Sequence, residues 1–141
     1  MAGGQGPAGR RGAGAALSEP LTVRVHDLGQ ARAVLELAAG RDVMLVTASG
    51  SAAFAGVGFW HAVERALGHP VVIDCGGDAG LAMAALREGA RDLLFTGQAA
   101  IADKLSSMAQ QLGGRLRCDL PGGVVALLAG EHPERRMGDF R

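Results

Sequence analysis

The sequence lacks the features that would point to a disulfide framework, a membrane span or a nucleic-acid partner. Its two cysteines, Cys75 and Cys118, are too few and too far apart for a disulfide scaffold or a paired-cysteine metal site. No apolar run approaches the ~20 residues needed to cross a bilayer. The 14 basic and 14 acidic residues cancel, so no overall positive field attracts nucleic acid. We expect a cytoplasmic protein with no membrane or nucleic-acid partner.

Both ends of the chain are predicted to be tails around one domain. Residues 1–19 are rich in Gly, Ala and Arg and have no apolar signal core, a composition that predicts disorder. Residues 20–130 are predicted to form a single α/β domain, since a chain of 141 residues has room for one core. An apolar run near residue 125 predicts an edge strand, and the mixed charges of residues 131–141 predict a solvated tail.

Short β-branched runs alternate with longer Ala- and Leu-rich runs, which is typical of repeated βα units and a parallel sheet. The predicted strands are 21–25, 42–48, 70–74, 92–96 and 115–120. The intervening helices are predicted to begin near Gly29, Gly56, Asp78 and Gln98. Each helix is followed by a glycine suited to a left-handed C-cap. The fold class is therefore α/β, with a parallel sheet of four to five strands.

The polarity of the strands predicts their order in the sheet. The second, third and fourth strands are apolar on both faces, whereas the first and fifth alternate apolar with polar residues. Because strands at an edge alternate in this way, we place strands one and five at the edges, in the order 1-2-3-4-5. This is the order of half a TIM barrel. A flavodoxin-like three-layer sheet, in the order 2-1-3-4-5, is the alternative.

The half-barrel order predicts self-association. Right-handed crossovers place every helix on one face of the sheet, so the apolar residues on the other face of strands two to four would be bare. Such a patch is larger than a soluble monomer normally exposes, and a second copy would cover it. On the second helix, Phe59, Val63 and Leu67 form the predicted apolar stripe. Trp60 is then expected at the surface or at an interface.

Three stretches of the chain carry a family likeness: VHDLGQARAVLELAAGRDVMLVTASGSAAFAG, HPVVIDCGGDAGLAMAALREGARDLLFTG and LSSMAQQLGGRLRCDLPGG. In order and spacing they resemble the first half of class II fructose-bisphosphate aldolases, which are zinc enzymes built on a TIM barrel. The likeness covers roughly residues 21–123, which is about half of such a barrel. It implies a half-barrel that lacks the family's second half.

The resemblance also implies that the metal site is lost. Where the family has an Asp-His pair, with the aspartate in proton transfer and the histidine on zinc, this chain has Gly76 and Gly77. The family's asparagine on the first strand corresponds to Arg24, its glutamate after the fifth to Asp119, and its serine after the second falls next to Ser49. A catalytic zinc needs three protein ligands, and this neighbourhood offers no such set. We expect no metal and no cofactor.

Asp74 and Cys75 end a central strand, where parallel α/β proteins place their chemistry. One hypothesis is that Asp74 transfers protons and Cys75 is a thiolate activated by a nearby cation. The alternative is that Asp74 hydrogen-bonds the following Gly-Gly turn and that Cys75 fills the core. The sequence favours this alternative, because no histidine lies nearby to form a dyad. Asp78 is expected to cap the next helix.

The candidate ligand-binding residues lie on the same rim of the sheet and on the predicted edge strands. They are Arg24, His26, Ser49, Gly76, Gly77, Thr96, Gly97 and Asp119. If Arg24, His26, Arg115 and Arg117 face one side, they form a basic lining suited to a phosphorylated metabolite. Ordinary βα turns and edge strands protected by charge are the alternative interpretation.

Two functions follow from these patterns. We favour a non-catalytic, homo-oligomeric, aldolase-like half-barrel that acts as a binding or interaction module for a small phosphorylated metabolite. The alternative is a metal-independent lyase or isomerase that acts on a phosphorylated sugar with Asp74 as the general base. An enzyme would need a walled pocket that holds Asp74 near a second polar group.

Overall fold

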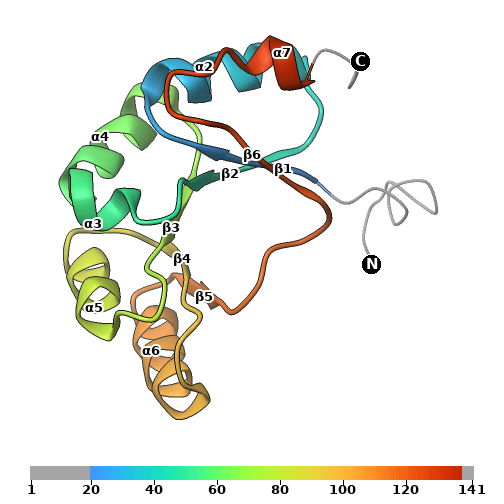
Figure 1. The fold of residues 1–141 in the computed structure, drawn as a ribbon. Helices are drawn as coiled ribbons and strands as arrows, with labels where there is room; N and C mark the ends of the chain where they lie inside the picture. The colour runs from blue at the N-terminus through green and yellow to red at the C-terminus, as the bar shows by residue number, and fades with distance from the viewer. Residues whose placement is uncertain (1–19, 138–141) are drawn as a thin grey trace, which may run out of the picture.

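In the computed structural model, which describes residues 20–137, parallel strands form one sheet in the order β5-β4-β3-β2-β1-β6 (Figure 1). The strands are β1 (Leu21–Val25), β2 (Val43–Thr47), β3 (Val71–Asp74), β4 (Asp92–Leu94), β5 (Arg115–Arg117) and β6 (Val124–Ala126). The helices are α2 (Leu28–Ala38), α3 (Ser51–Ala55), α4 (Val57–Leu67), α5 (Ala79–Arg87), α6 (Ala99–Gln111) and α7 (Pro133–Met137). Within this range no helix is both long and apolar enough to traverse a bilayer. The predicted tail 1–19 lies outside the described residues.

The predicted α/β class and parallel sheet are confirmed, with one strand more than expected. The first five strands follow the half-barrel order and not the flavodoxin-like one. The placement of β1 at an edge is wrong, because β6 pairs with it and sets Thr22 opposite Val124. The polar residues of β1 have another cause. Thr22 and Arg24 point to the face that carries no helices, where both make hydrogen bonds.

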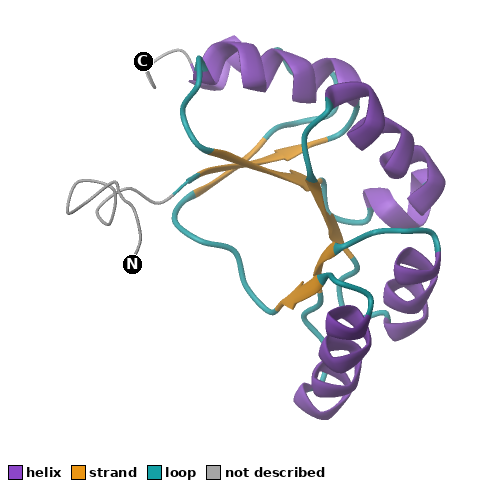
Figure 2. Ribbon diagram, turned by 180° about the vertical axis from the view of Figure 1, so that it is seen from behind, coloured by secondary structure: helices purple, strands orange, loops and turns teal. Residues whose placement is uncertain are grey.

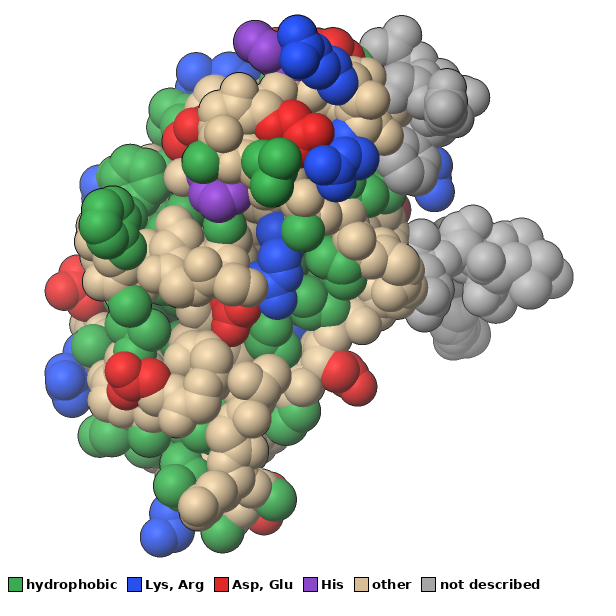
Figure 3. Space-filling model, viewed as in Figure 1, with side chains coloured by type: hydrophobic (Ala, Val, Ile, Leu, Met, Phe, Trp, Pro, Cys, Tyr) green, Lys and Arg blue, Asp and Glu red, His purple; other side chains and the backbone are tan. Residues whose placement is uncertain are grey.

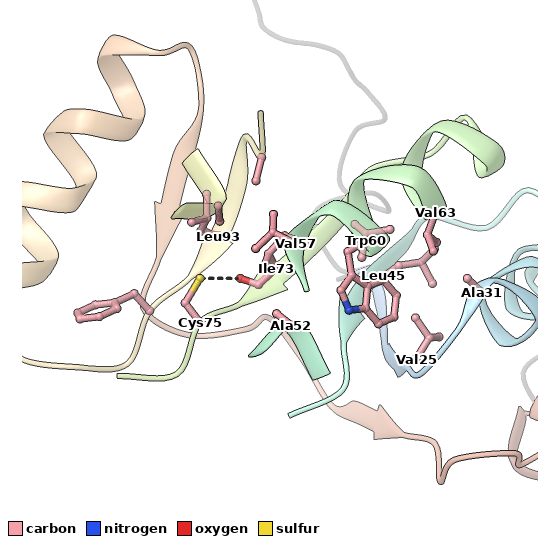
Figure 4. Close-up of a cluster of buried hydrophobic side chains, with 14 of the residues drawn as sticks. Val25, Ala31, Leu45, Ala52, Val57, Trp60, Val63, Ile73, Cys75 and Leu93 are labelled. Atoms are coloured by element: carbon pink, nitrogen blue, oxygen red, sulfur yellow. Dashed lines mark hydrogen bonds between the residues drawn. The ribbon is translucent and has the colours of Figure 1, made fainter. Parts of the chain in front are cut away.

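The helices pack on the convex face of the curved sheet and enclose the main core (Figures 1 and 2). Trp60 of α4 is fully buried in this core, beside Leu45 of β2 and Val63 (Figure 4). The expectation of a surface or interface position for Trp60 is therefore wrong. Helix α4 turns Val57, Trp60 and Val63 toward the sheet, and Phe59 is left 42% exposed.

The concave face of the sheet carries no helix, yet its apolar residues are not bare. Val46, Val72 and Leu94, from the three central strands, form a second cluster and are at most 3% exposed. Leu120 packs on this cluster from the segment 118–123, here called the strap, which links β5 to β6 across the open side of the sheet (Figure 2). Thr22 Oγ1 anchors the strap by donating to the carbonyl of Pro121 at 3.0 Å. The patch for which we expected a second copy is thus covered within one chain.

The C-terminal segment is not a tail along its whole described length. Within residues 131–141, α7 packs against α2 and buries Met137 in the main core. The amide of Gln30, on α2, donates to the carbonyls of Leu128 and Glu131 and holds the approach to α7. The predicted solvated tail is therefore corrected for residues 133–137. Helix α7 buries Pro133 and Met137, and the charged residues around them gave this segment the pattern of a solvated tail.

Shortening the strap's apolar contact should destabilise the fold. Leu120→Ala is expected to lower the free energy of unfolding by about 1–2 kcal/mol, because the half-buried side chain covers the second cluster. Leu112→Ala is the matched control, since Leu112 is 47% exposed at the end of α6. Urea unfolding measures both. Equal effects of the two substitutions would show that the strap adds no stability.

Candidate functional site

A pocket of about 400 Å³ opens where β1 to β4 end, at the carboxyl edge of the sheet. Its lining residues are Arg24, Ser49, Gly50, Ala53, Asp74, Cys75, Gly76, Asp78, Leu81, Leu94 and Thr96. Six of the ten candidates predicted from the sequence are among them: Arg24, Ser49, Asp74, Cys75, Gly76 and Thr96. The structure thus brings together residues that follow or end four different strands.

An ion pair forms part of the pocket wall and spans the sheet. Arg24 on β1 donates through Nη1 to Asp74 Oδ2 on β3 at 2.7 Å, and to the carbonyl of Thr47 on β2 at 2.9 Å. The two charged side chains are 17% and 10% exposed, and they share the concave face with the second apolar cluster. In the view of Figure 3, one basic and one acidic side chain lie side by side near the middle of the molecule, with hydrophobic side chains around them. Because a buried charge without a partner is strongly destabilising, each member of the pair requires the other.

Asp74 also shapes the loop that follows β3. Its Oδ1 accepts the N–H of Gly76 at 2.8 Å, and its own N–H donates to Thr47 Oγ1 at 3.0 Å. Gly76 has a φ of +55°, in the left-handed region that favours glycine. Both carboxylate oxygens of Asp74 are therefore engaged in holding the turn and the arginine. This arrangement matches the alternative in which Asp74 supports the Gly-Gly turn.

Cys75 is a core residue rather than a thiolate. Its side chain is 3% exposed, and Sγ donates to the carbonyl of Ile73 at 3.7 Å (Figure 4). Burial, followed by the negative charges of Asp74 and Asp78, raises the pKa of the Cys75 thiol to about 12. A nucleophilic cysteine needs a cation or a helix N-terminus that lowers its pKa. The hypothesis of an activated Cys75 is therefore corrected.

Asp78 caps α5, as predicted, and also lines the pocket. Its Oδ1 accepts the N–H of Leu81 at 3.0 Å, so the start of the helix already has an anionic partner. The side chain is exposed, and Oδ2 makes no hydrogen bond within residues 20–137. Asp78 thus brings an unpaired carboxylate oxygen to the pocket.

Gly77 and Gly97 do not line the pocket, and a side chain would clash at Gly97 but not at Gly77. A Cβ on Gly77 would lie 3.6 Å from the Cα of Gly97, and a Cβ on Gly97 would overlap the ring of Phe95. The loops that carry them are joined by the N–H of Thr96, which donates to the carbonyl of Gly76 at 2.8 Å. Gly97 therefore serves packing against Phe95, and Gly77 has no such role, although the sequence placed both among the ligand-binding residues.

The remaining candidates lie elsewhere, so the predicted continuous basic lining does not form. His26 Nε2 lies 2.9 Å from the carbonyl of Leu127. Arg117 binds Asp92 through two hydrogen bonds of 2.7 and 2.9 Å. Asp119 lines a separate hollow beside Arg115 and Arg117. Arg24 and Arg117 are each held by an aspartate, because an unpaired charge is costly on a largely buried side chain.

Sequence reasoning missed the apolar wall of the pocket. Ala53 lies on α3, a five-residue helix within a stretch expected to be a loop, and Leu81 lies in the first turn of α5. Leu94 belongs to the buried end of β4. Their apolar character was visible in the sequence, but no local pattern tells which apolar side chains turn toward a rim.

Within residues 20–137 no cluster of three or more His, Cys, Asp or Glu side chains could hold a metal ion. Comparisons with protein-family models, with curated proteins and with solved structures found no match to this chain. The aldolase resemblance therefore stays a prediction from the sequence.

The two cysteines should differ sharply in reactivity. At about pH 8, iodoacetamide should modify the exposed Cys118 and leave Cys75 unmodified, because Cys75 is buried and its pKa is raised to about 12. Mass spectrometry of the digested protein measures both sites. Unfolding in urea before alkylation is the control and should make the two equally reactive. Rapid modification of native Cys75 would show an activated thiolate.

The same pKa shift predicts a loss of stability at alkaline pH. The pKa of the Cys75 thiol is higher in the folded state than its ordinary value of 9.0. The stability that the protonated thiol contributes to the folded state is therefore complete below pH 9.0 and is lost as pH rises toward about 12. Cys75→Ala should flatten this part of the stability profile relative to Cys118→Ala. Identical alkaline slopes would contradict the assignment.

Proposed function

We propose that this chain is a non-catalytic binding module that holds a small anionic metabolite in the rim pocket over Arg24. The phosphorylated metabolite predicted from the sequence belongs to this class of ligand. The observation that carries the proposal is that residues from four strand ends converge on one pocket around a partly buried arginine. Pockets at the carboxyl edge of parallel sheets are the usual ligand sites of such folds.

Arg24 has binding capacity left for a ligand. Both of its hydrogen bonds use Nη1, and within residues 20–137 its Nε and Nη2 make none. A guanidinium carries five N–H donors in a fixed plane. The ion pair with Asp74 therefore orients the arginine without exhausting its donors. A prearranged donor group of this kind binds an anion at a lower entropic cost than a free side chain.

The non-catalytic assignment rests on Asp74. The lyase or isomerase hypothesis requires Asp74 to take a proton from a bound sugar, but Arg24 and Gly76 already engage both of its oxygens. Cys75 is buried and protonated at neutral pH. Asp78, whose carboxylate is exposed, caps a helix. The pocket thus has donors and acceptors for binding, and its carboxylates already hold a turn, an arginine or a helix start, which favours binding over proton transfer.

A titration followed by NMR tests the proposal. Inorganic phosphate and acetate, added to the ¹⁵N-labelled chain, should shift the amide signals of Gly50, Gly76 and Thr96. Arg24→Lys keeps the charge beside Asp74 but loses the planar fork, and should weaken binding roughly tenfold. Arg115→Lys, on the exposed edge strand β5, is the matched control. Absence of localised shifts, or equal weakening by both variants, would refute the proposal.

We also propose that the chain self-associates, but through fewer exposed apolar residues than the sequence suggested. The concave apolar cluster is buried within one chain and no longer requires a partner. Phe54 on α3 is 95% exposed and Leu128 is 67% exposed, and both remain open to a second copy. Sedimentation at micromolar concentration should show a species heavier than the 14.3 kDa monomer. Phe54→Ser should shift it toward the monomer, and a wild-type monomer throughout would refute self-association.

A further inference from the structure

We infer that the rim pocket selects a small carboxylate with neighbouring hydroxyl groups over the corresponding phosphate ester. This inference rests on the proposed function and names the ligand class for the same site. Three features of the pocket carry it: the balance of its charges, the free edge of Arg24, and the unpaired oxygen of Asp78.

The charges that line the pocket limit how much negative charge a ligand can bring. They are one guanidinium, Arg24, and two carboxylates, Asp74 and Asp78. Asp74 is 2.7 Å from Arg24 and already balances its charge. A phosphate ester carries −1.5 to −2 at neutral pH, whereas a carboxylate carries −1. The unpaired charge of Asp78 therefore repels a phosphate ester more strongly than a carboxylate.

The free edge of Arg24 matches a single planar carboxylate. Nη1 is committed to Asp74 and to the carbonyl of Thr47, which leaves the Nε–Nη2 edge without a hydrogen-bond partner in the described chain. That edge presents two parallel N–H groups, the arrangement that binds both oxygens of one carboxylate. Arg24 in this arrangement binds two carboxylates at once, Asp74 of the protein and one from the ligand.

A phosphate at the start of α5 would meet a carboxylate that is already there. The start of a helix is the usual place for a phosphate in this fold, but at α5 the carboxylate of Asp78 already accepts the N–H of Leu81. Helix α3, whose first residues also face the rim, has only five residues. A phosphate in the pocket would therefore lie beside the negative charge of Asp78, which weakens its binding.

The other polar groups of the pocket suit ligand hydroxyls. Asp78 Oδ2 is an unused acceptor, and the hydroxyls of Ser49 and Thr96 donate or accept as required. Ala53 and Leu81 add an apolar wall for the carbon chain. A short hydroxy acid places its carboxylate on Arg24 and a hydroxyl on Asp78.

A matched pair of compounds tests the selectivity. D-Glycerate and glycerol 3-phosphate both have three carbons and two hydroxyls and differ in the anionic group. Titrated by NMR at constant ionic strength, glycerate should bind roughly tenfold more tightly. Tighter binding of glycerol 3-phosphate would overturn this inference and leave the rim pocket as a ligand site. If neither compound shifts the pocket signals at about 10 mM, far above a millimolar dissociation constant, the proposed function itself fails.

Asp78→Asn tests the cause of the selectivity. Asparagine still caps a helix well, so α5 should keep its start while the repelling charge is gone. The preference for glycerate should fall at least about threefold, mainly through tighter binding of glycerol 3-phosphate. Asp103→Asn, an exposed charge on α6, is the control and should leave the preference unchanged. An undiminished preference in Asp78→Asn would contradict the role given to Asp78, and so would an equal loss in both variants.

Discussion

The ion pair between Arg24 and Asp74 is the interaction on which the concave half of this molecule depends. Within residues 20–137 all helices pack on the opposite face of the sheet, so only side chains and the strap of that range cover this one (Figures 1 and 2). The apolar cluster of Val46, Val72 and Leu94 is buried beside charged residues. Burial of such charges is costly unless each has a partner of opposite charge. A 2.7 Å contact across β2 meets this requirement, because each charge supplies the partner that water would otherwise have to provide.

The same pair sets the geometry of the rim. Asp74 uses its second oxygen to fix the turn at Gly76, and that turn brings Asp78 to the start of α5. The loop after β4 then packs against this turn through Thr96. One salt bridge therefore links the middle of the sheet to the two loops that wall the pocket. The contacts of Asp74 with Arg24 and Gly76 therefore both stabilise the concave face and order the loops around the pocket.

Local signals in the sequence predicted the regular parts of the fold but not the long-range contacts. Strand positions, the Asp78 cap and the glycines after the helices follow from alternation and capping rules, which act over a few residues. The pairing of β6 with β1 joins segments about a hundred residues apart, and it removed the edge that the polar pattern of β1 had suggested. The alternation of polar and apolar residues placed Arg24 within a strand and Asp74 at the end of one. It did not show that they were partners, and so it left Asp74 open as a base.

That partnership is the basis of the proposal that the pocket binds rather than transforms its ligand. A carboxylate that already accepts hydrogen bonds on both oxygens is held in place and is poorly suited to accept a proton from a ligand. The arginine that holds it keeps three N–H donors, on Nε and Nη2, without a partner in residues 20–137, since a guanidinium has more N–H groups than one carboxylate can use. In the proposed site, Asp74 is not the base but orients Arg24, which binds the ligand. Under the proposed function, the oriented arginine binds the ligand and the unpaired oxygen of the capping aspartate distinguishes anions by their charge.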